Sequence, residues 1–168
     1  MGDYLKLSGG VPSDTNANIT SAGASDAGKI VKLDATGKLD ATLFPSGAAS
    51  ETRTMLTSEA LAAGDLVNFW NSGGPRMRKA DATTTGKEAH GFVLAAVASG
   101  ASGTVYPEEN VLTGLTGLTP GARQFLAATA GARTETAPVA AGQVAQVIGV
   151  ALSASEILFR PDTPIVLA

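Results

Sequence analysis

An internal repeat constrains the fold of this chain more than any other feature of its sequence. The stretch EAHGFVLAAVASGASGTVYP, residues 88–107, recurs in outline as QVAQVIGVALSASEILFRP, residues 143–161. Gly91 matches Gly149 within these stretches. A unit of about fifty residues cannot bury its apolar face alone, so we expect two copies of one β unit to pack together.

The lead-in to each copy supports this alignment. LAAG ends at Gly64 and LTPG ends at Gly121, and these glycines precede the later matched ones by 27 and 28 residues. Other matched positions are Leu94 with Leu152, and the pair Val105-Tyr106 with the pair Leu158-Phe159. The repeat predicts an all-β fold, a small β-barrel or β-sandwich built from an internal duplication. It would occupy residues 51–168, with copies at about 59–115 and 116–168.

Composition agrees with an all-β fold. The 168 residues include 20 glycines and 44% hydrophobic residues, many of them alanine, whereas aromatic residues make up only 5%. Such a composition favours short strands and tight turns over the long amphipathic helices of a catalytic α/β domain. We expect one domain with a real core and an appended segment.

Charge and cysteine content exclude several kinds of partner. The net charge is −3 and the 12 basic residues are spread thinly, so we expect no direct binding to nucleic acid. The absence of cysteine excludes disulfides, thiolate metal ligands and cysteine nucleophiles. No apolar run approaches the roughly 20 residues that span a membrane, and the N-terminus lacks the features of a signal peptide. Synthesis in a cytoplasm is therefore the expectation.

Residues 1–20 predict an extended N-terminal arm. Its apolar residues are Tyr4, Leu5 and Leu7, and two glycines, a proline and polar residues follow them. Such a segment cannot stabilise itself, so it is either disordered or becomes ordered on a partner.

Residues 21–50 predict a short β-hairpin and linker for attachment or oligomerisation. Asp34-Ala-Thr-Gly37 is typical of a turn between two apolar pieces. Two short strands are only marginally stable by themselves. We therefore expect other chains or the barrel to contact the apolar residues, which are Ile30, Val31 and Leu33 before the turn and Leu39, Leu43 and Phe44 after it.

The duplicated domain contains clear strand patterns. Residues 66–70 form a first strand that ends at the turn Asn71-Ser-Gly-Gly-Pro75. The apolar runs 91–98 and 144–151 are typical of strands buried on both faces. Residues 111–115 are expected to complete the first copy.

Two further runs resemble virion proteins of tailed bacteriophages. GKIVKLDATGKLDATLFP is similar to a segment of head-decoration proteins and fibres that links an attachment arm to an outer domain. LTPGARQFLAATAGARTETAP, together with residues 143–161, resembles the outer β domains of such proteins. The resemblance implies a homotrimer bound to the major capsid protein.

No residue pattern predicts catalysis, a cofactor or a metal site. Gly23–Lys29 has the spacing of a phosphate-binding loop, but Ile30 replaces the serine or threonine that binds magnesium. The single histidine, His90, has no second ligand or oriented nucleophile in the sequence pattern. Glu108-Glu109 is better explained as a solvated loop tip than as a cation site.

Trp70, the only tryptophan, follows Phe69 in a predicted strand, where neighbouring side chains face opposite ways. One of the two must point away from the core. Trp70 is then either covered by a neighbouring loop or placed at a subunit interface.

The resemblance to virion proteins, together with the absence of a catalytic pattern, implies a non-enzymatic capsid decoration or cement protein that binds the outside of a bacteriophage head and stabilises the shell. It would be made in the bacterial cytoplasm and located on the capsid exterior, without nucleic-acid or membrane partners. The alternative is a tail-fibre or receptor-binding module. The predicted partner-binding residues are Tyr4, Leu5, Leu7, Ile30, Val31, Leu33, Leu43, Phe44 and Trp70.

Overall fold

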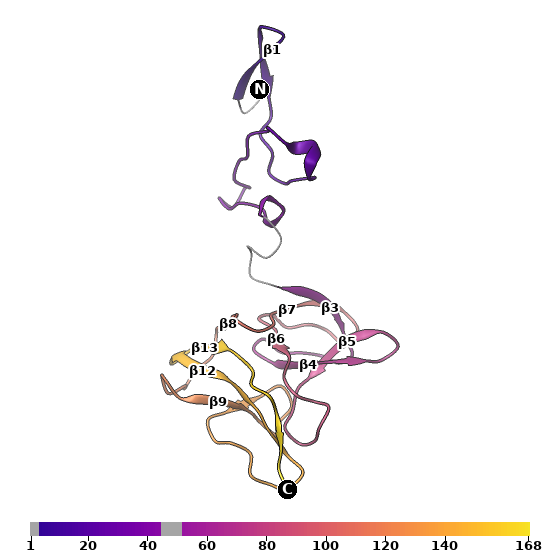
Figure 1. Ribbon diagram of the computed structural model, residues 1–168, viewed down its shortest axis with the longest axis vertical. Helices are drawn as coiled ribbons and strands as arrows, with labels where there is room; N and C mark the ends of the chain where they lie inside the picture. The colour runs from indigo at the N-terminus through magenta and orange to yellow at the C-terminus, as the bar shows by residue number, and fades with distance from the viewer. Residues whose placement is uncertain (1–3, 45–51) are drawn as a thin grey trace. The chain divides into compact units, whose positions relative to one another are not determined.

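The computed structural model describes residues 4–44 and 52–168. The chain divides into two compact units, residues 1–49 and residues 50–168, and each is described by itself (Figure 1). Both are built from β-strands and turns, with two 3-10 turns in the N-terminal unit. The predicted all-β fold class is confirmed.

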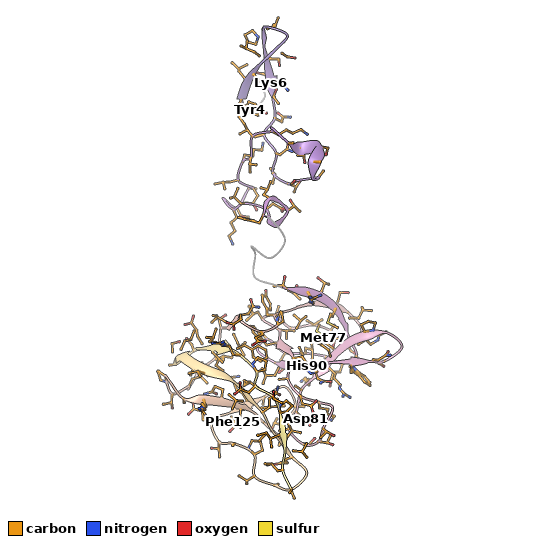
Figure 2. All side chains as sticks on the ribbon, in the orientation of Figure 1. Tyr4, Lys6, Met77, Asp81, His90 and Phe125 are labelled. Atoms are coloured by element: carbon orange, nitrogen blue, oxygen red, sulfur yellow. The ribbon has the colours of Figure 1, made fainter. Side chains whose placement is uncertain are left out.

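A two-stranded hairpin begins the N-terminal unit. β1 (Tyr4–Ser8) pairs antiparallel with β2 (Val11–Thr15) across a Gly9-Gly10 turn. Both glycines have positive φ angles, 61° and 86°, as the central residues of the commonest two-residue hairpin turn require. Residues 4–15 of the predicted arm therefore form a hairpin, and Figure 2 shows Tyr4 and Lys6 on its first strand.

The remainder of the N-terminal unit is mostly irregular. The 3-10 turns are η1 (Ala24–Asp26) and η2 (Ala41–Leu43). The predicted turn at residues 34–37 is present, since the Gly37 amide donates to the Asp34 carbonyl at 3.0 Å.

The hairpin expected around this turn does not form in the described part of residues 21–50. The Asp34 carboxylate accepts hydrogen bonds from the amides of Thr36 and Lys38, which folds the loop onto itself. Val31 forms an isolated bridge with Asn18 instead of pairing across the turn. Local side-chain hydrogen bonds therefore compete successfully with a strand ladder here.

The first sheet of residues 50–168 closes on itself. Its strand order is β6-β4-β5-β3-β7, and neighbours are antiparallel except for the parallel pair β3 and β5. A backbone bridge between Phe92 and Tyr106 joins β6 to the chain just after β7. We call this sheet the closed barrel; its strands are β3 (Arg53–Thr57), β4 (Leu66–Asn71), β5 (Pro75–Lys79), β6 (Gly91–Phe92) and β7 (Ser102–Val105).

The second sheet repeats this arrangement. Its order is β10-β9-β12-β13-β8, so β8, β9, β10, β12 and β13 correspond to β3, β4, β5, β6 and β7. In the described residues no ladder joins β8 to β10, whereas β3 pairs with β5. We call this sheet the open barrel; its strands are β8 (Val111–Leu112), β9 (Arg123–Leu126), β10 (Arg133–Thr134), β12 (Val147–Ser153) and β13 (Glu156–Phe159).

A small additional sheet pairs β11 (Val144–Ala145) with β14 (Ile165–Val166). Figure 1 shows β3 to β7 gathered in one part of this unit, and β9, β12 and β13 in another.

Equivalent hydrogen bonds confirm the internal duplication. The Gly64 amide donates to the Val93 carbonyl at 2.8 Å, and the Gly121 amide donates to the Ala151 carbonyl at 2.8 Å. The chain direction and pairing partners also agree between the two sheets. Matched glycines therefore occupy the same turn in each copy.

The boundary between the copies differs from the expected one. We expected residues 111–115 to end the first copy, but β8 pairs with β13 in the open barrel. The first copy also begins earlier, because β3 supplies the strand that corresponds to β8. Both errors arise because β3 and β8 are short and carry too few apolar residues to reveal their pairing partners.

The alignment at the end of each copy shifts by one residue. Phe92 pairs with Tyr106, and Val150 pairs with Leu158. Tyr106 is therefore equivalent to Leu158, not to Phe159, because a β-bridge and not sequence spacing defines the match.

The two apolar runs are not continuous strands. Only Gly91 and Phe92 of residues 91–98 are in a strand, and Ala95 and Ala96 are exposed. Residues 144–151 are divided between β11 and β12. Alanine side chains are small enough to be exposed in turns. The apolar runs therefore predicted longer strands than the structure contains.

Two apolar clusters form the core, and both lie in residues 50–168. The cluster inside the closed barrel contains Leu61, Val67, Met77, Val93, Val97 and Val105. The larger cluster joins the copies, since Phe92 of the first meets Phe159 of the second edge to face at 5.4 Å. The copies thus complete each other's core.

Candidate partner-binding surface

The N-terminal unit leaves its apolar side chains exposed. Among its described residues, 4–44, Ala17 alone is buried. Nine large apolar side chains of the same range are exposed: Leu5, Leu7, Val11, Ile19, Ile30, Val31, Leu33, Leu39 and Phe44. This unit therefore has almost no core of its own, in contrast to residues 50–168.

One apolar face belongs to the hairpin. Leu5 is 69% exposed and Leu7 is 74% exposed. They lie on the same face because they are two residues apart in a strand, and Leu7 stands opposite Pro12. Tyr4 is half-buried on the other face. The structure thus brings two of the three predicted arm residues onto one surface.

Two backbone hydrogen bonds of Asn18 hold the segment that contains Ile30 and Val31, and we call this pair of bonds the clasp. The Asn18 amide donates to the Ile30 carbonyl at 2.8 Å, and the Lys32 amide donates to the Asn18 carbonyl at 3.0 Å. Ile30 and Val31 are exposed on either side of this clasp.

Two cavities connect the predicted residues of the N-terminal unit. Val31 and Leu43 line a cavity of about 260 Å³ together with Asn18 and Asp26. Ile30 and Tyr4 line a second cavity of about 510 Å³. Leu33 and Phe44 line neither cavity and are exposed.

Asp26 stabilises the loop at residues 23–29, in which the glycine and lysine spacing matches that of a phosphate-binding loop. Its carboxylate accepts a hydrogen bond from the Ala22 amide and forms an ion pair with Lys29 at 2.6 Å. These hydrogen bonds, the Ala22 amide first, lower the pKa of Asp26 to about 2. The loop therefore already holds an anion, its own carboxylate, next to the lysine that a phosphate would need.

Trp70 faces away from the interior of the closed barrel, whereas Phe69 packs against the cluster inside it. The indole Nε1 donates to Ser58 Oγ at 3.2 Å, and the Arg78 guanidinium lies 4.4 Å from the ring centroid. The ring is half-buried. Residues of its own barrel thus cover part of Trp70, and a subunit contact through its exposed part stays a prediction.

His90 has a structural hydrogen bond. Its Nδ1 accepts from the Phe69 amide at 3.0 Å, and burial lowers the pKa of the imidazole although nearby Glu88 opposes this. The ring lines a cavity of about 510 Å³ with Glu88, Glu108 and Gln146. Because Nδ1 is engaged with the backbone, that atom is not available as a base.

Sequence reasoning missed part of the exposed surface. Val11 and Ile19 are exposed apolar residues of the N-terminal unit that we did not predict as partner-binding. The Gly9-Gly10 pair was the available signal for Val11, because it marks a hairpin turn with Val11 at its far side.

Within residues 4–44 and 52–168, no three acidic or histidine side chains gather closely enough to hold a metal ion. No helix in these ranges has the length and apolar character needed to cross a membrane.

Comparison of the sequence with known protein families and with curated proteins found no match to either.

Proposed function

We propose that this protein is a capsid decoration protein that binds the outside of a bacteriophage head through its N-terminal unit. The observation that supports this most is the contrast between its two units. Residues 50–168 have a complete core, while the described part of the N-terminal unit exposes nine large apolar side chains. An apolar surface on a segment without its own core is typical of a segment that binds a partner.

The energetics favour a multivalent attachment. Full burial of one large apolar side chain stabilises a complex by about 1.5–3 kcal/mol, and ordering the segment offsets part of this gain. Leu5, Leu7 and Phe44 each expose enough apolar surface to contribute to the free energy of binding when a partner covers them. In the proposed homotrimer three such units bind one site on the shell, so a weak single contact becomes a stable attachment. Binding only to the assembled shell then stabilises the shell by mass action.

Co-sedimentation with shells that lack the protein tests this proposal. We expect Leu5→Asp with Leu7→Asp to weaken binding at least about tenfold, because two apolar contacts are replaced by charges that remain hydrated. The matched control is Val139→Asp in residues 50–168, at a side chain that is 87% exposed. The control should bind as the unchanged protein does.

Equal binding by the double variant and the control would contradict attachment through the hairpin. A different location on the particle would contradict decoration itself. Cryo-electron microscopy that found a few copies at the tail, and none on the head, would support the tail-fibre or receptor-binding alternative instead.

A further inference from the structure

The outer face of the closed barrel carries a patch of cationic and aromatic side chains. β4, β5 and β3 lie side by side in this sheet (Figure 1). Trp70 of β4 stands opposite Arg76 of β5, and Arg76 stands opposite Leu56 of β3. Paired residues share a face of the sheet, and so does Arg78, which follows Arg76 by two positions in the same strand. We call Trp70, Arg76, Arg78 and Leu56 the arginine patch.

The two positive charges of the patch are not balanced by a carboxylate. Both arginines are half-buried, as is Trp70, and Leu56 is 41% exposed. Among the residues that the structure describes, none forms an ion pair with either guanidinium. Arg76 Nε donates to the Ser72 carbonyl at 3.0 Å, which leaves both terminal nitrogens of Arg76 as free donors. Two neighbouring positive charges repel each other, so an anion between them would be favourable.

Arg78 is held in a fixed orientation beside Arg76. Its Nε donates to Asn68 Oδ1 at 3.0 Å, and its Nη2 donates to the Gly86 carbonyl at 2.6 Å. Its guanidinium also lies 4.4 Å from the centroid of the Trp70 ring. Nη1 has no acceptor in residues 4–44 and 52–168 and is free to donate. A guanidinium that is already oriented loses little conformational entropy when it binds an acceptor.

The internal duplication provides a comparison for the patch. Gln124 pairs with Gly149 as Val67 pairs with Gly91. Gln124 of the open barrel is therefore equivalent to Val67 of the closed barrel.

The next strand of each barrel extends this match. Arg133 pairs with Leu126 as Met77 pairs with Phe69. Arg133 is therefore equivalent to Met77, the residue between the two arginines of the patch.

The fold of the repeated unit does not require the arginine patch. The open barrel carries smaller, uncharged residues at the corresponding positions: Ala127 for Trp70, Ala132 for Arg76 and Thr134 for Arg78. The same strand pairing thus forms without the indole and without the charges. A role in binding explains why one copy has them.

The free donors of the patch fit a carboxylate. A carboxylate accepts two parallel hydrogen bonds from one guanidinium, and Leu56 provides an apolar contact beside Arg76 on the same face. Tryptophan and arginine are also the residue types that contribute most to binding at protein interfaces. A polyanion fits less well, because the net charge of −3 would repel its other charges.

We propose that the arginine patch binds an acidic segment of a protein partner. A glutamate or aspartate of that segment contacts Arg76 and Arg78, and a neighbouring apolar side chain contacts Leu56. This inference is independent of the attachment proposed for the N-terminal unit, because every residue of the patch lies in residues 50–168.

The fluorescence of Trp70, the only tryptophan, reports directly on this patch. The probe is a short synthetic peptide that alternates leucine with glutamate, blocked at both ends and titrated into the full chain. We expect a saturable change of the emission with a dissociation constant of about 1 mM or lower. A matched peptide with glutamine in place of glutamate should bind at least about tenfold more weakly. Absence of a saturable change with the glutamate peptide, or equal binding of both peptides, would overturn the proposal.

Other occupants are tested in the same way. Inorganic phosphate and a single-stranded oligonucleotide should both bind more weakly than the glutamate peptide. Binding of either as tight as that of the peptide would contradict a preference for an acidic protein segment. Sedimentation equilibrium of the protein alone tests for a second copy of the chain. Self-association that changes the Trp70 emission would show that a second copy occupies the patch, and the proposed partner would then be wrong.

Variants taken from the open barrel sharpen the test. Arg76→Ala with Arg78→Thr installs the residues of the open barrel, and we expect it to abolish the peptide-induced change of emission. Arg76→Ala alone should weaken binding at least about tenfold with nearly the same unfolding midpoint, and this variant decides if the double variant does not fold. The control is Arg123→Ala, at an exposed position of β9, which should bind normally. Unchanged binding by Arg76→Ala would show that the patch is not the site.

Discussion

At the scale of single residues, the matched glycines are explained by close backbone approach. A Cβ on Gly91 would lie 2.8 Å from Val105 Cγ2 and 2.9 Å from the Tyr106 carbonyl oxygen. A Cβ on Gly149 would overlap the Leu158 carbonyl oxygen, and Gly149 has a φ of 146° that other residues rarely adopt. The repeat therefore preserves glycine where adjacent strands leave no room for a side chain.

We predict that Gly149→Ala destabilises the fold by about 3 kcal/mol or more, because a backbone atom must move. In thermal unfolding this corresponds to a fall of the midpoint by about 6–12 °C. The comparison variant is Gly142→Ala, at a positive φ of 79° with open space around the Cβ position. Its expected cost is only about 1 kcal/mol. Similar midpoints for the two variants would contradict the steric argument.

A second residue prediction concerns His90. Burial lowers its pKa from the ordinary value of 6.5, so the folded state favours the neutral ring. Its contribution to stability is complete above pH 6.5 and is lost as the pH falls below that value. Protonation would also abolish the hydrogen bond from the Phe69 amide. Because it is the only histidine, we expect a small fall of the unfolding midpoint between about pH 7 and about pH 5.

The variant His90→Gln keeps a hydrogen-bond acceptor but does not titrate in this range. Its unfolding midpoint should therefore be the same at both ends of this pH range. Carboxylates with lowered pKa, such as Asp81 and Glu135, add pH dependence only at more acidic pH. If the unfolding midpoint of the variant fell with pH as much as that of the unchanged protein, the pH dependence would come from groups other than His90.

At the scale of elements, the short strand β8 decides where one copy ends and the next begins. Leu112 is fully buried and stands opposite Ile157 of β13, whereas its neighbour Val111 is exposed. We predict that Leu112→Ala costs about 2–5 kcal/mol and that Val111→Ala costs under about 1 kcal/mol. Denaturant unfolding measures both. A reversed order would mean that β8 presents its other face to the core.

At the scale of the whole molecule, stability and attachment are assigned to different parts of the chain. Every member of both core clusters lies in residues 50–168. We predict that a fragment of residues 50–168 folds alone and unfolds cooperatively, with a midpoint within about 2 °C of the full chain. The same fragment should not bind shells. Loss of cooperative unfolding in the fragment would show that the N-terminal unit contributes to the core.

Some of the candidate surface could be predicted from the sequence, and the reason is local. Leu5, Leu7 and Ile30 are large apolar residues among polar and glycine neighbours, and no nearby segment has enough apolar residues to cover them. Their exposure follows from composition. The hairpin at residues 4–15 was not predicted, because a segment with so few apolar residues was expected to need a partner to become ordered, although Gly9-Gly10 is typical of a two-residue hairpin turn.

By itself, the sequence determined the all-β class, the duplication and the turns, because glycine positions and hydrophobic spacing act over a few residues. Only the tertiary structure decided that β8 belongs to the second copy, that Tyr106 matches Leu158, and that one barrel closes while the other stays open. Strand pairing joins residues far apart in the chain, so its register depends on edges that no local pattern encodes.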